Sequence, residues 1–432
     1  MDRRVVLKQS VLALAAAATM TTVGIVSAYP LDAYPATGIE RLEASRLANE
    51  GKLRGGKQPA GALLKTDQVD LRLADRPDFS IPPPDPAFTR EVVAQLGDRV
   101  DEYNIAVLDL SDLAHPRYAE HNADVARNPG SVGKLLVALA MFQMLADLYP
   151  DSIEQRIHIL KDTVVTADDF VISDHHTVRF YDPATGELKR HPLHPGDKGT
   201  LWEFMDWMVS ASSNSAASQV MRELVLMAHF GKRYPVSDAE AETFLRTTPK
   251  SELSAIFAKA MQEPATRNGL DITRFRQGGF FTRVGQSRIP GPNSYATPRE
   301  LMHYVVKMEK GELVDRWSSR EIKRLMYQTE RRIRYATSPA LAKAAVYFKT
   351  GSLFRCLPGH HCRAYEGDKE NLMNSVAIVE SPAGTLDRYY IVTLMSNVLG
   401  RNSASDHAAL ATRLDRLIEK LNARRLSPPA SE

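Results

Sequence analysis

The stretch NPGSVGKLLVALAMF, residues 128 to 142, places a serine and a lysine three positions apart at the start of an apolar run. The length of that run and its few β-branched residues predict a buried helix after Pro129 and Gly130. On one helical face the Ser131 hydroxyl and the Lys134 amine can meet, and a partly desolvated lysine has a lowered pKa. A neutral amine can accept the hydroxyl proton, so the pair suits an activated serine nucleophile. The alternative is that Ser131 caps the helix while the Lys134 amine extends to water.

Two further groups of polar residues follow along the chain. WMVSASSNSAASQVM carries Ser212 and Asn214 in a small-residue loop, and VYFKTGSLF carries a lysine and two hydroxyls on a β-rich run. The residues of the second group are Lys349, Thr350, Gly351 and Ser352. Each motif alone is weak evidence for a site, because S-x-N and K-T-G often occur by chance. The alternative is that S-x-N caps a helix in a loop and that Lys349 is an ordinary lysine on an edge strand. S-x-x-K, S-x-N and K-T-G in this order, each on the expected kind of element, indicate a serine acyl-transfer site.

The hydrophobic pattern predicts the elements that position these groups. A helix is expected over 89–96, strands over 104–110 and near PRYAEHN, mainly helices over 131–335, and then three β-rich runs, AAVYFKTGSL, NSVAIVES and RYYIVTLMSNV. An amphipathic helix over SASDHAALATRLDRLIEKL, capped by Ser405 or Asp406, completes the domain. Strands on both sides of a helical middle predict an α+β fold, an antiparallel sheet flanked by helices with an inserted all-helical lobe.

The N-terminal residues read as an export signal. Arg3 and Arg4 precede an uncharged apolar run that ends in small residues, which is typical of a signal peptide over 1–28. DRRVVLKQS also resembles a twin-arginine signal, which predicts a periplasmic or extracellular protein. We expect no later segment to reach a membrane-spanning length, so the mature chain should not insert stably in a membrane.

The remaining chain divides by composition. Residues 29–87, with the Pro-rich stretch RPDFSIPPPDPAF, are expected to be an appendage and linker. One hydrolase domain is expected over 88–426, with a tail over 427–432. The formal net charge is only +3, which gives no sign of a nucleic-acid partner. We expect a monomer that needs no cofactor.

Cys356 and Cys362 close the short loop CLPGHHC. In an oxidising compartment a disulfide is the expected state. His360 and His361 between them offer a metal site as the alternative, although these ligands are more crowded than usual zinc ligands. We therefore assign no metal. Two other histidine pairs lie in polar loops and receive no role: His175 with His176, and His191 with His194.

On the three motifs, the sequence resembles the penicillin-recognising serine hydrolases, that is, the class A β-lactamases and their D-alanyl-D-alanine peptidase relatives. The resemblance covers roughly residues 88–425 and includes NADVARNPGSVGKLL and YATPRELMHYVVKMEKGELV. It implies that Ser131 attacks the substrate carbonyl, that Lys134 takes its proton, and that Ser212 protonates the leaving nitrogen. It also implies an oxyanion hole made by the backbone N–H groups of Ser131 and Ser352. The residues implied to bind substrate are Asn214, Lys349, Thr350, Gly351 and Ser352.

The sequence departs from the class A pattern in two places. The middle residue of the second motif is Ser213 rather than aspartate, as among the peptidases. The omega-loop glutamate that activates the deacylating water is missing, since Arg276 and Gln277 stand where it is expected. Glu263 in QEPATRN is a candidate deacylation base only if the loop is enlarged, and the alternative is a surface carboxylate. Arg401 is a candidate second partner for the substrate carboxylate.

Three functions remain open at this point. The first is β-lactamase-like hydrolysis of β-lactam amides through an acyl-enzyme, with slow deacylation. The second is a D-alanyl-D-alanine-type cell-wall peptidase or transpeptidase. The third is a β-lactam-binding protein that is acylated without turnover. The partner is accordingly a small-molecule β-lactam or a cell-wall peptide.

Overall fold

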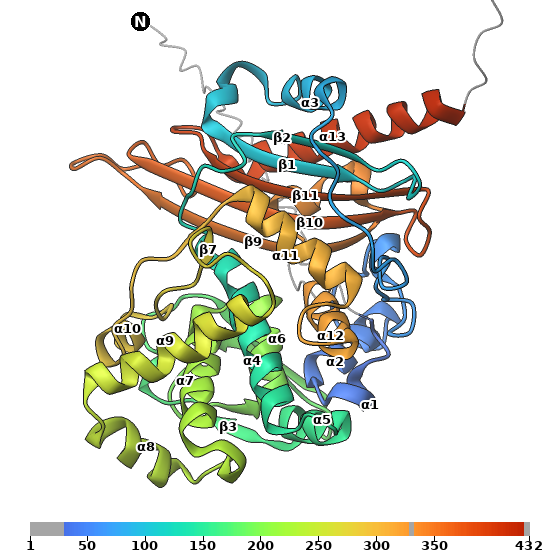
Figure 1. Ribbon diagram of the computed structural model, residues 1–432. Helices are drawn as coiled ribbons and strands as arrows, with labels where there is room; N and C mark the ends of the chain where they lie inside the picture. Colours follow the sequence, from blue (N-terminus) through green and yellow to red (C-terminus); the bar gives the residue numbers. More distant parts are fainter. Residues whose placement is uncertain (1–29, 328–331, 427–432) are drawn as a thin grey trace, which may run out of the picture.

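The computed structural model describes residues 30–327 and 332–426, so the expected signal peptide and C-terminal tail lie outside the described residues. Figure 1 shows a sheet layer above a helical lobe, which is the expected α+β arrangement. The α-helices are α1 (Tyr34–Thr37), α2 (Glu40–Asn49), α3 (Pro86–Val93), α4 (Lys134–Leu148), α5 (Ile153–Asp162), α6 (Leu201–Val209), α7 (Asn214–Phe230), α8 (Asp238–Thr247), α9 (Lys250–Arg267), α10 (Arg283–Arg288), α11 (Pro298–Lys310), α12 (Arg316–Tyr327) and α13 (Ser403–Leu426).

The main sheet has the strand order β2-β1-β11-β10-β9, and every neighbouring pair is antiparallel. Its strands are β1 (Tyr103–Asp109), β2 (Arg117–His121), β9 (Ala345–Arg355), β10 (Glu370–Ser381) and β11 (Arg388–Asn397). Strand β9, which carries K-T-G, is an edge strand. Its outer backbone groups are therefore available to the cavity beside it.

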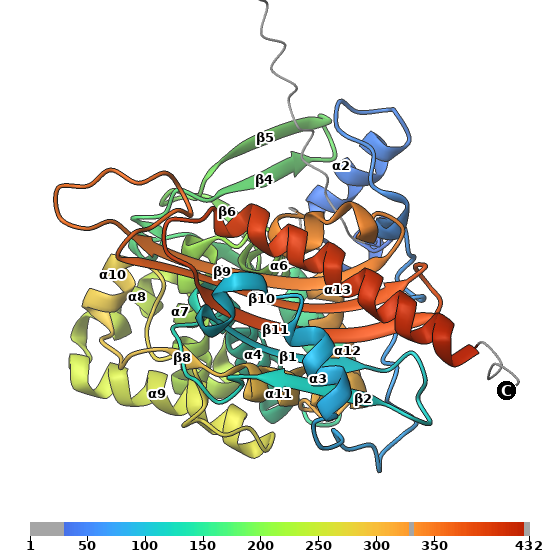
Figure 2. The ribbon, with the colours of Figure 1, turned by 90° about the horizontal axis from the view of Figure 1, so that it is seen from above.

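Helices cover both faces of this sheet. Figure 1 shows α3 and α13 on one face and α11 and α12 on the other, and Figure 2 shows α13 lying across the sheet. The hydrophobic core is accordingly divided into two clusters, one under α3 and α13 and a larger one that continues into the helical lobe. Strand β10 is buried along nearly its whole length, because both of its faces are covered.

Helix α4 forms the centre of the helical lobe. Residues 130–148 are long and apolar enough to cross a membrane, which corrects our expectation that no later segment reaches that length. The protein itself buries 72% of this window, and the apolar side chains of α4 belong to the larger core cluster. A helix that is hydrophobic all round and enclosed by others is the core helix of a lobe.

The helical middle also contains short strands that the sequence did not suggest. β4 (Thr177–Asp182) and β5 (Glu187–Pro192) form a hairpin, β3 (Val164–Thr166) pairs with β6 (Lys198–Thr200), and β7 (Phe275–Arg276) pairs with β8 (Tyr295–Ala296). The expected cap of the C-terminal helix was wrong. Asn402 Oδ1 accepts a hydrogen bond from the Ser405 backbone N–H at 3.2 Å, so Asn402 caps α13.

Residues 30–87, expected to be an appendage, pack against the domain. Ile39 and Leu42 are fully buried in the larger core cluster. Arg41 on α2 forms a buried ion pair with Asp206 on α6. This segment therefore shares a hydrophobic core with the helical lobe.

Candidate active site

Ser131 and Lys134 meet as the spacing predicts. Ser131 lies in a 3₁₀ turn, η3 (Gly130–Gly133), and makes no capping bond to α4. Lys134 is completely buried, and its Nζ lies 2.9 Å from Ser131 Oγ. Burial lowers the pKa of Lys134 to about 7, although the nearby Asp174 carboxylate opposes the shift. The structure thus excludes both the capping serine and the solvated lysine.

The S-x-N loop supplies the other contacts of this lysine. Lys134 Nζ donates to the Ser212 carbonyl at 2.7 Å and to Asn214 Oδ1 at 2.8 Å. Ser212 has φ +60°, in the left-handed region that non-glycine residues rarely adopt. Residues in this sparsely populated region cluster at active sites, where the surrounding structure holds them. Ser212 Oγ accepts a hydrogen bond from Lys349 Nζ at 2.8 Å, which links the second motif to the third.

Asp174, a residue that the sequence analysis did not single out, fixes this loop from outside the motif. Its Oδ2 accepts from Ser213 Oγ at 3.1 Å and from the backbone N–H groups of Asn214 and Ser215 at 2.7 and 3.0 Å. A carboxylate at the start of α7 also complements the helix dipole. Position 213 holds a serine instead of an aspartate. We interpret Asp174, from a distant loop, as the residue that supplies the carboxylate to this helix start instead.

Strand β9 lies directly against the turn that holds the serine. A methyl group on Gly351 would lie 2.2 Å from the Pro129 carbonyl oxygen and 2.7 Å from the Ser131 backbone nitrogen. A methyl group on Gly130 would lie 3.1 Å from the Ser352 backbone nitrogen. Only glycine permits this approach, which brings the amide nitrogens of Ser131 and Ser352 to the same end of the cavity.

Arg334 gives this end of the cavity its charge, beside the buried amine of Lys349. Lys349 is buried, and burial, together with the Lys134 and Arg334 charges, holds the pKa of its amine well below the usual value. Arg334, in the turn η6 (Arg334–Thr337), donates to Thr350 Oγ1 and to Ser352 Oγ, both at 3.0 Å. The guanidinium and the Ser352 hydroxyl so placed suit a carboxylate, whereas Thr350 Oγ1 donates its hydrogen to the Asn374 carbonyl at 2.8 Å.

Sequence reasoning missed Arg334 and named Arg401 instead. Arg401 lies 3.6 Å from Asp98 and 3.5 Å from Asp406, and it does not line the cavity. The stretch RRIRYATS contains several arginines, and nothing in their order separates Arg334 from its neighbours. Only the fold shows which one reaches β9.

The three motifs surround one cavity of about 320 Å³, whose lining includes Ser131, Ser212 and Lys349. Within the described ranges, its lining contains lysine, arginine and histidine side chains but no carboxylate. The histidines are His175 and His176, which the sequence analysis left without a role. The lining is therefore basic, and the Arg334 guanidinium is its permanently charged member.

The structure does not bring Glu263 to this site. Glu263 lies on α9 with its side chain 51% exposed, 4.0 Å from Lys259. Gln277 is instead buried behind the catalytic turn, where a methyl group on Gly133 would lie 1.9 Å from its Oε1. The Gln277 Nε2 donates to the Gly279 carbonyl at 2.6 Å. An amide thus occupies the region behind Ser131, and Glu263 is a surface carboxylate.

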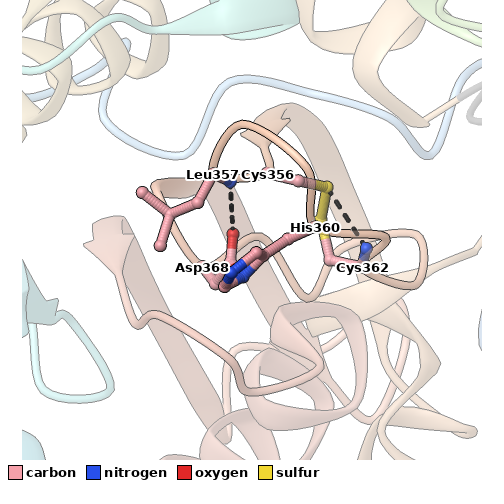
Figure 3. Close-up of a disulfide and its surroundings, with 5 residues drawn as sticks. All are labelled: Cys356, Leu357, His360, Cys362 and Asp368. Atoms are coloured by element: carbon pink, nitrogen blue, oxygen red, sulfur yellow. Dashed lines mark hydrogen bonds and ion pairs between the residues drawn. A yellow bond between two sulfur atoms is a disulfide. The ribbon is translucent and has the colours of Figure 1, made fainter.

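The loop between β9 and β10 carries the two cysteines. Figure 3 shows the sulfur atoms of Cys356 and Cys362 joined in a disulfide. His360 points away from them, and its Nδ1 lies 2.6 Å from Asp368 Oδ2. His191, on β5, and His194, just after that strand, stack on each other outside the cavity lining.

Comparisons with known proteins relate this chain to one family. The profile of the Beta-lactamase enzyme family matches residues 88–418. Similar solved structures include a beta-lactamase from Sphaerobacter thermophilus, with 12% identity, a TM-score of 0.49 and coverage of 79% of this chain and 99% of that one. PBP-A has 14% identity, a TM-score of 0.47 and coverage of 79% and 100%. A representative class A beta-lactamase from Bacteroides cellulosilyticus has 15% identity, a TM-score of 0.43 and coverage of 78% and 98%.

A search of curated proteins found no match. The family profile spans most of the chain and contains Ser131, Ser212 and Lys349 within its limits. These residues meet around one cavity of an α+β fold. This chain therefore belongs to the beta-lactamase enzyme family, within the wider group of penicillin-recognising serine enzymes.

Proposed function

We propose that the protein is a serine hydrolase that opens β-lactam amides through an acyl-enzyme on Ser131. The observation that carries this proposal is the buried Lys134 amine, 2.9 Å from Ser131 Oγ. A pKa of about 7 leaves much of the Lys134 amine neutral at physiological pH. It can then accept the hydroxyl proton while Oγ attacks the carbonyl.

The remaining steps use groups around the same cavity. The backbone N–H groups of Ser131 and Ser352 stabilise the charge on the carbonyl oxygen. When the amide bond breaks, Ser212 Oγ gives a proton to the leaving nitrogen. The proton that Lys134 accepted then restores the Ser212 hydroxyl, so Lys134 is neutral again before deacylation. Lys349 Nζ lies 2.8 Å from Ser212 Oγ and orients that hydroxyl. Arg334, with the Ser352 hydroxyl that it contacts, holds the substrate carboxylate, and its contact with Thr350 Oγ1 positions the guanidinium.

We propose that the acyl-enzyme is hydrolysed slowly. Deacylation needs a base within reach of a water, which typically contributes 10²–10⁴-fold. Within the described ranges, no carboxylate lines the cavity, and Glu263 faces solvent on α9. Lys134 then has to act as the base in both half-reactions.

A D-alanyl-D-alanine-type peptidase or transpeptidase is the second candidate. The same lack of a cavity carboxylate favours it, because an acyl-enzyme that excludes water can persist until an amine attacks it. The Arg334 guanidinium would then bind the terminal carboxylate of a peptide. Both candidates use the same acylation step and differ in the fate of the acyl group.

Intact-mass spectrometry with a penicillin tests the proposal. We expect one covalent adduct, absent in Ser131→Ala and present in the control Ser210→Ala, whose serine lines the same cavity but donates to the Asp206 carbonyl. An adduct on Ser131→Ala would overturn the assignment. A chase then separates the fates: steady loss of the adduct indicates a β-lactamase, loss only with an added amine indicates a transpeptidase, and permanent label indicates a binding protein.

We also propose that the protein works outside the cytoplasm as a monomer. The twin-arginine-like leader, which lies outside the described residues, and the Cys356–Cys362 disulfide both support an oxidising compartment. Replacing Arg3 and Arg4 together by lysine should retain the protein in the cytoplasm, as measured by cell fractionation. Unchanged export of that variant would contradict the twin-arginine route.

A further inference from the structure

The loop between β9 and β10 reaches the mouth of the cavity and is internally fixed. The disulfide closes residues 356–362, and Figure 3 shows Asp368 turned toward both Leu357 and His360. Asp368 Oδ1 accepts from the Leu357 N–H at 2.7 Å, while Oδ2 lies 2.6 Å from His360 Nδ1. The loop also returns to the sheet, because the Lys369 N–H bonds to the Arg355 carbonyl at 3.1 Å. Its shape is therefore set before any ligand arrives.

This loop presents the ring of Tyr365 to the cavity. Tyr365 has φ +66°, and its carbonyl accepts from the Ser403 N–H at 3.0 Å and from Ser403 Oγ at 3.2 Å. A tyrosine is held in this unfavourable backbone region only where its surroundings fix it. The Arg334 guanidinium lies over the ring, 4.8 Å from its centroid. The same guanidinium reaches the Ser352 hydroxyl, where the substrate carboxylate is proposed to bind.

Phe354 completes an aromatic corner with Tyr365. Their rings meet edge to face, with centroids 5.7 Å apart, and both residues line the cavity. Phe354 remains 37% exposed, although it is apolar. Large apolar side chains at the mouth of a cavity indicate a surface that a ligand covers.

We propose that Phe354 and Tyr365 form a subsite that binds an aromatic or planar apolar side chain of the substrate, with the disulfide holding the subsite in shape. This inference rests on the proposed acylation of Ser131. A substrate whose carboxylate meets Arg334 lies beside both rings, and its flat side chain can pack against them. Preorganisation by the disulfide spares the substrate the cost of ordering the loop.

The test compares two penicillins that share a nucleus, one with a phenylacetamido side chain and one with an acetamido side chain. The ratio of their acylation efficiencies on Ser131 should fall about three- to tenfold in Tyr365→Leu and in Phe354→Leu. It should be retained in Tyr365→Phe, which keeps the ring. The control Phe230→Leu removes a ring beside Arg233, 5.4 Å from its guanidinium and outside the cavity lining, and should leave the ratio unchanged.

Replacing Cys356 and Cys362 together by serine should lower the same ratio, because the rings lose their fixed support. An unchanged ratio in Tyr365→Leu and Phe354→Leu would overturn the subsite. If neither penicillin acylates the wild-type protein, the proposed function fails first. Calorimetric binding to Ser131→Ala then decides the subsite separately, since equal affinities for the two penicillins would overturn it.

Discussion

Lys134 is buried by its neighbours without an adjacent carboxylate to keep it charged. Its ammonium contacts one carbonyl, one amide oxygen and one hydroxyl, and it lies 4.7 Å from the centroid of the Phe281 ring. These groups accept hydrogen bonds but carry no full charge, so burial prevails and the pKa falls. The one opposing carboxylate, Asp174, has its oxygens engaged with α7 and with His176. The environment therefore favours a neutral amine, as a base requires.

The first prediction is that acylation of Ser131 rises with pH, with an apparent pKa of about 7. The pKa of Lys134 is lowered in the folded protein, so its amine is charged below that value and becomes a base above it. Stopped-flow acylation by a penicillin should show this rise, and Lys134→Arg should stay inactive at every pH because arginine remains protonated. A rate that does not change across neutral pH would remove Lys134 from the role of base.

The second prediction concerns the charge of Asp174. Because this carboxylate raises the pKa of Lys134, Asp174→Asn should shift the acylation profile to lower pH. The melting temperature should also fall, because the start of α7 loses a charged acceptor. Asp169→Asn, in the same loop but paired with Arg288 at 3.2 Å, is the control and should not move the profile. A profile that stays in place in Asp174→Asn would show that the two charges are not coupled.

At the scale of elements, the geometry of the proposed oxyanion hole depends on how closely β9 approaches the turn η3. Gly351 permits that approach, because any side chain there would overlap the Pro129 carbonyl. Thr350 Oγ1 fixes the strand on the other side by donating to the Asn374 carbonyl at 2.8 Å. The turn and the strand therefore cannot separate without moving both proposed oxyanion donors.

The third prediction follows from that contact. Gly351→Ala should displace β9 from Ser131 and reduce acylation by about 10²-fold, since small misplacements at a reacting centre have effects of that size. The free energy of unfolding should fall by only about 1–3 kcal/mol, as for other overpacked sites. Gly279→Ala is the control, because its added methyl group would meet only the Pro292 carbonyl oxygen, at 3.8 Å. Normal acylation by Gly351→Ala would contradict the proposed oxyanion hole.

The sequence predicted helices and strands correctly where the apolar character of a run of residues requires that the run be buried. The apolar run after Lys134 predicted a buried helix, which is α4, and NIAVLDL predicted a strand whose bounds differ from those of β1 by one residue. The hairpin β4–β5 was missed because its two six-residue strands, TVRFYD and ELKRHP, lack a clear apolar alternation. Asp174 and Arg334 were missed for another reason: each acts on a segment far away along the chain. No local pattern records such a contact.

At the scale of the whole molecule, the N-terminal segment is part of the folded unit. Arg41 and Asp206 form their ion pair with no solvent exposure of either side chain. Glu203, one helical turn away, has a pKa raised to about 7 by burial. Each charge of this buried ion pair is stable only in the presence of the other, because a single buried charge without an opposite charge is strongly destabilising.

The fourth prediction uses this pair. Arg41→Ala should lower the free energy of unfolding by about 3–5 kcal/mol, because the buried Asp206 carboxylate loses the guanidinium that offsets its charge. The double variant Arg41→Met with Asp206→Leu should recover much of that loss, since both charges are then gone. Urea unfolding of both variants measures the effect, with Arg46→Ala, whose ion pair with Glu43 is part-exposed, as the control. Equal stability of Arg41→Ala and the wild type would show that this segment contributes little to the fold.

The strand order also determines when the site can exist during synthesis. Tyr103 at the start of β1 pairs with Ser396 at the end of β11, so the sheet needs residues from both sides of the helical lobe. A growing chain emerges from the ribosome in order, so the lobe with Ser131 can fold while the strand with Lys349 is still to come. Closure of the sheet around the lobe is then the last event of folding. In an incomplete nascent chain, Ser131 would accordingly be present but could not react with a penicillin. Reaction with penicillin would therefore indicate that synthesis and folding are complete.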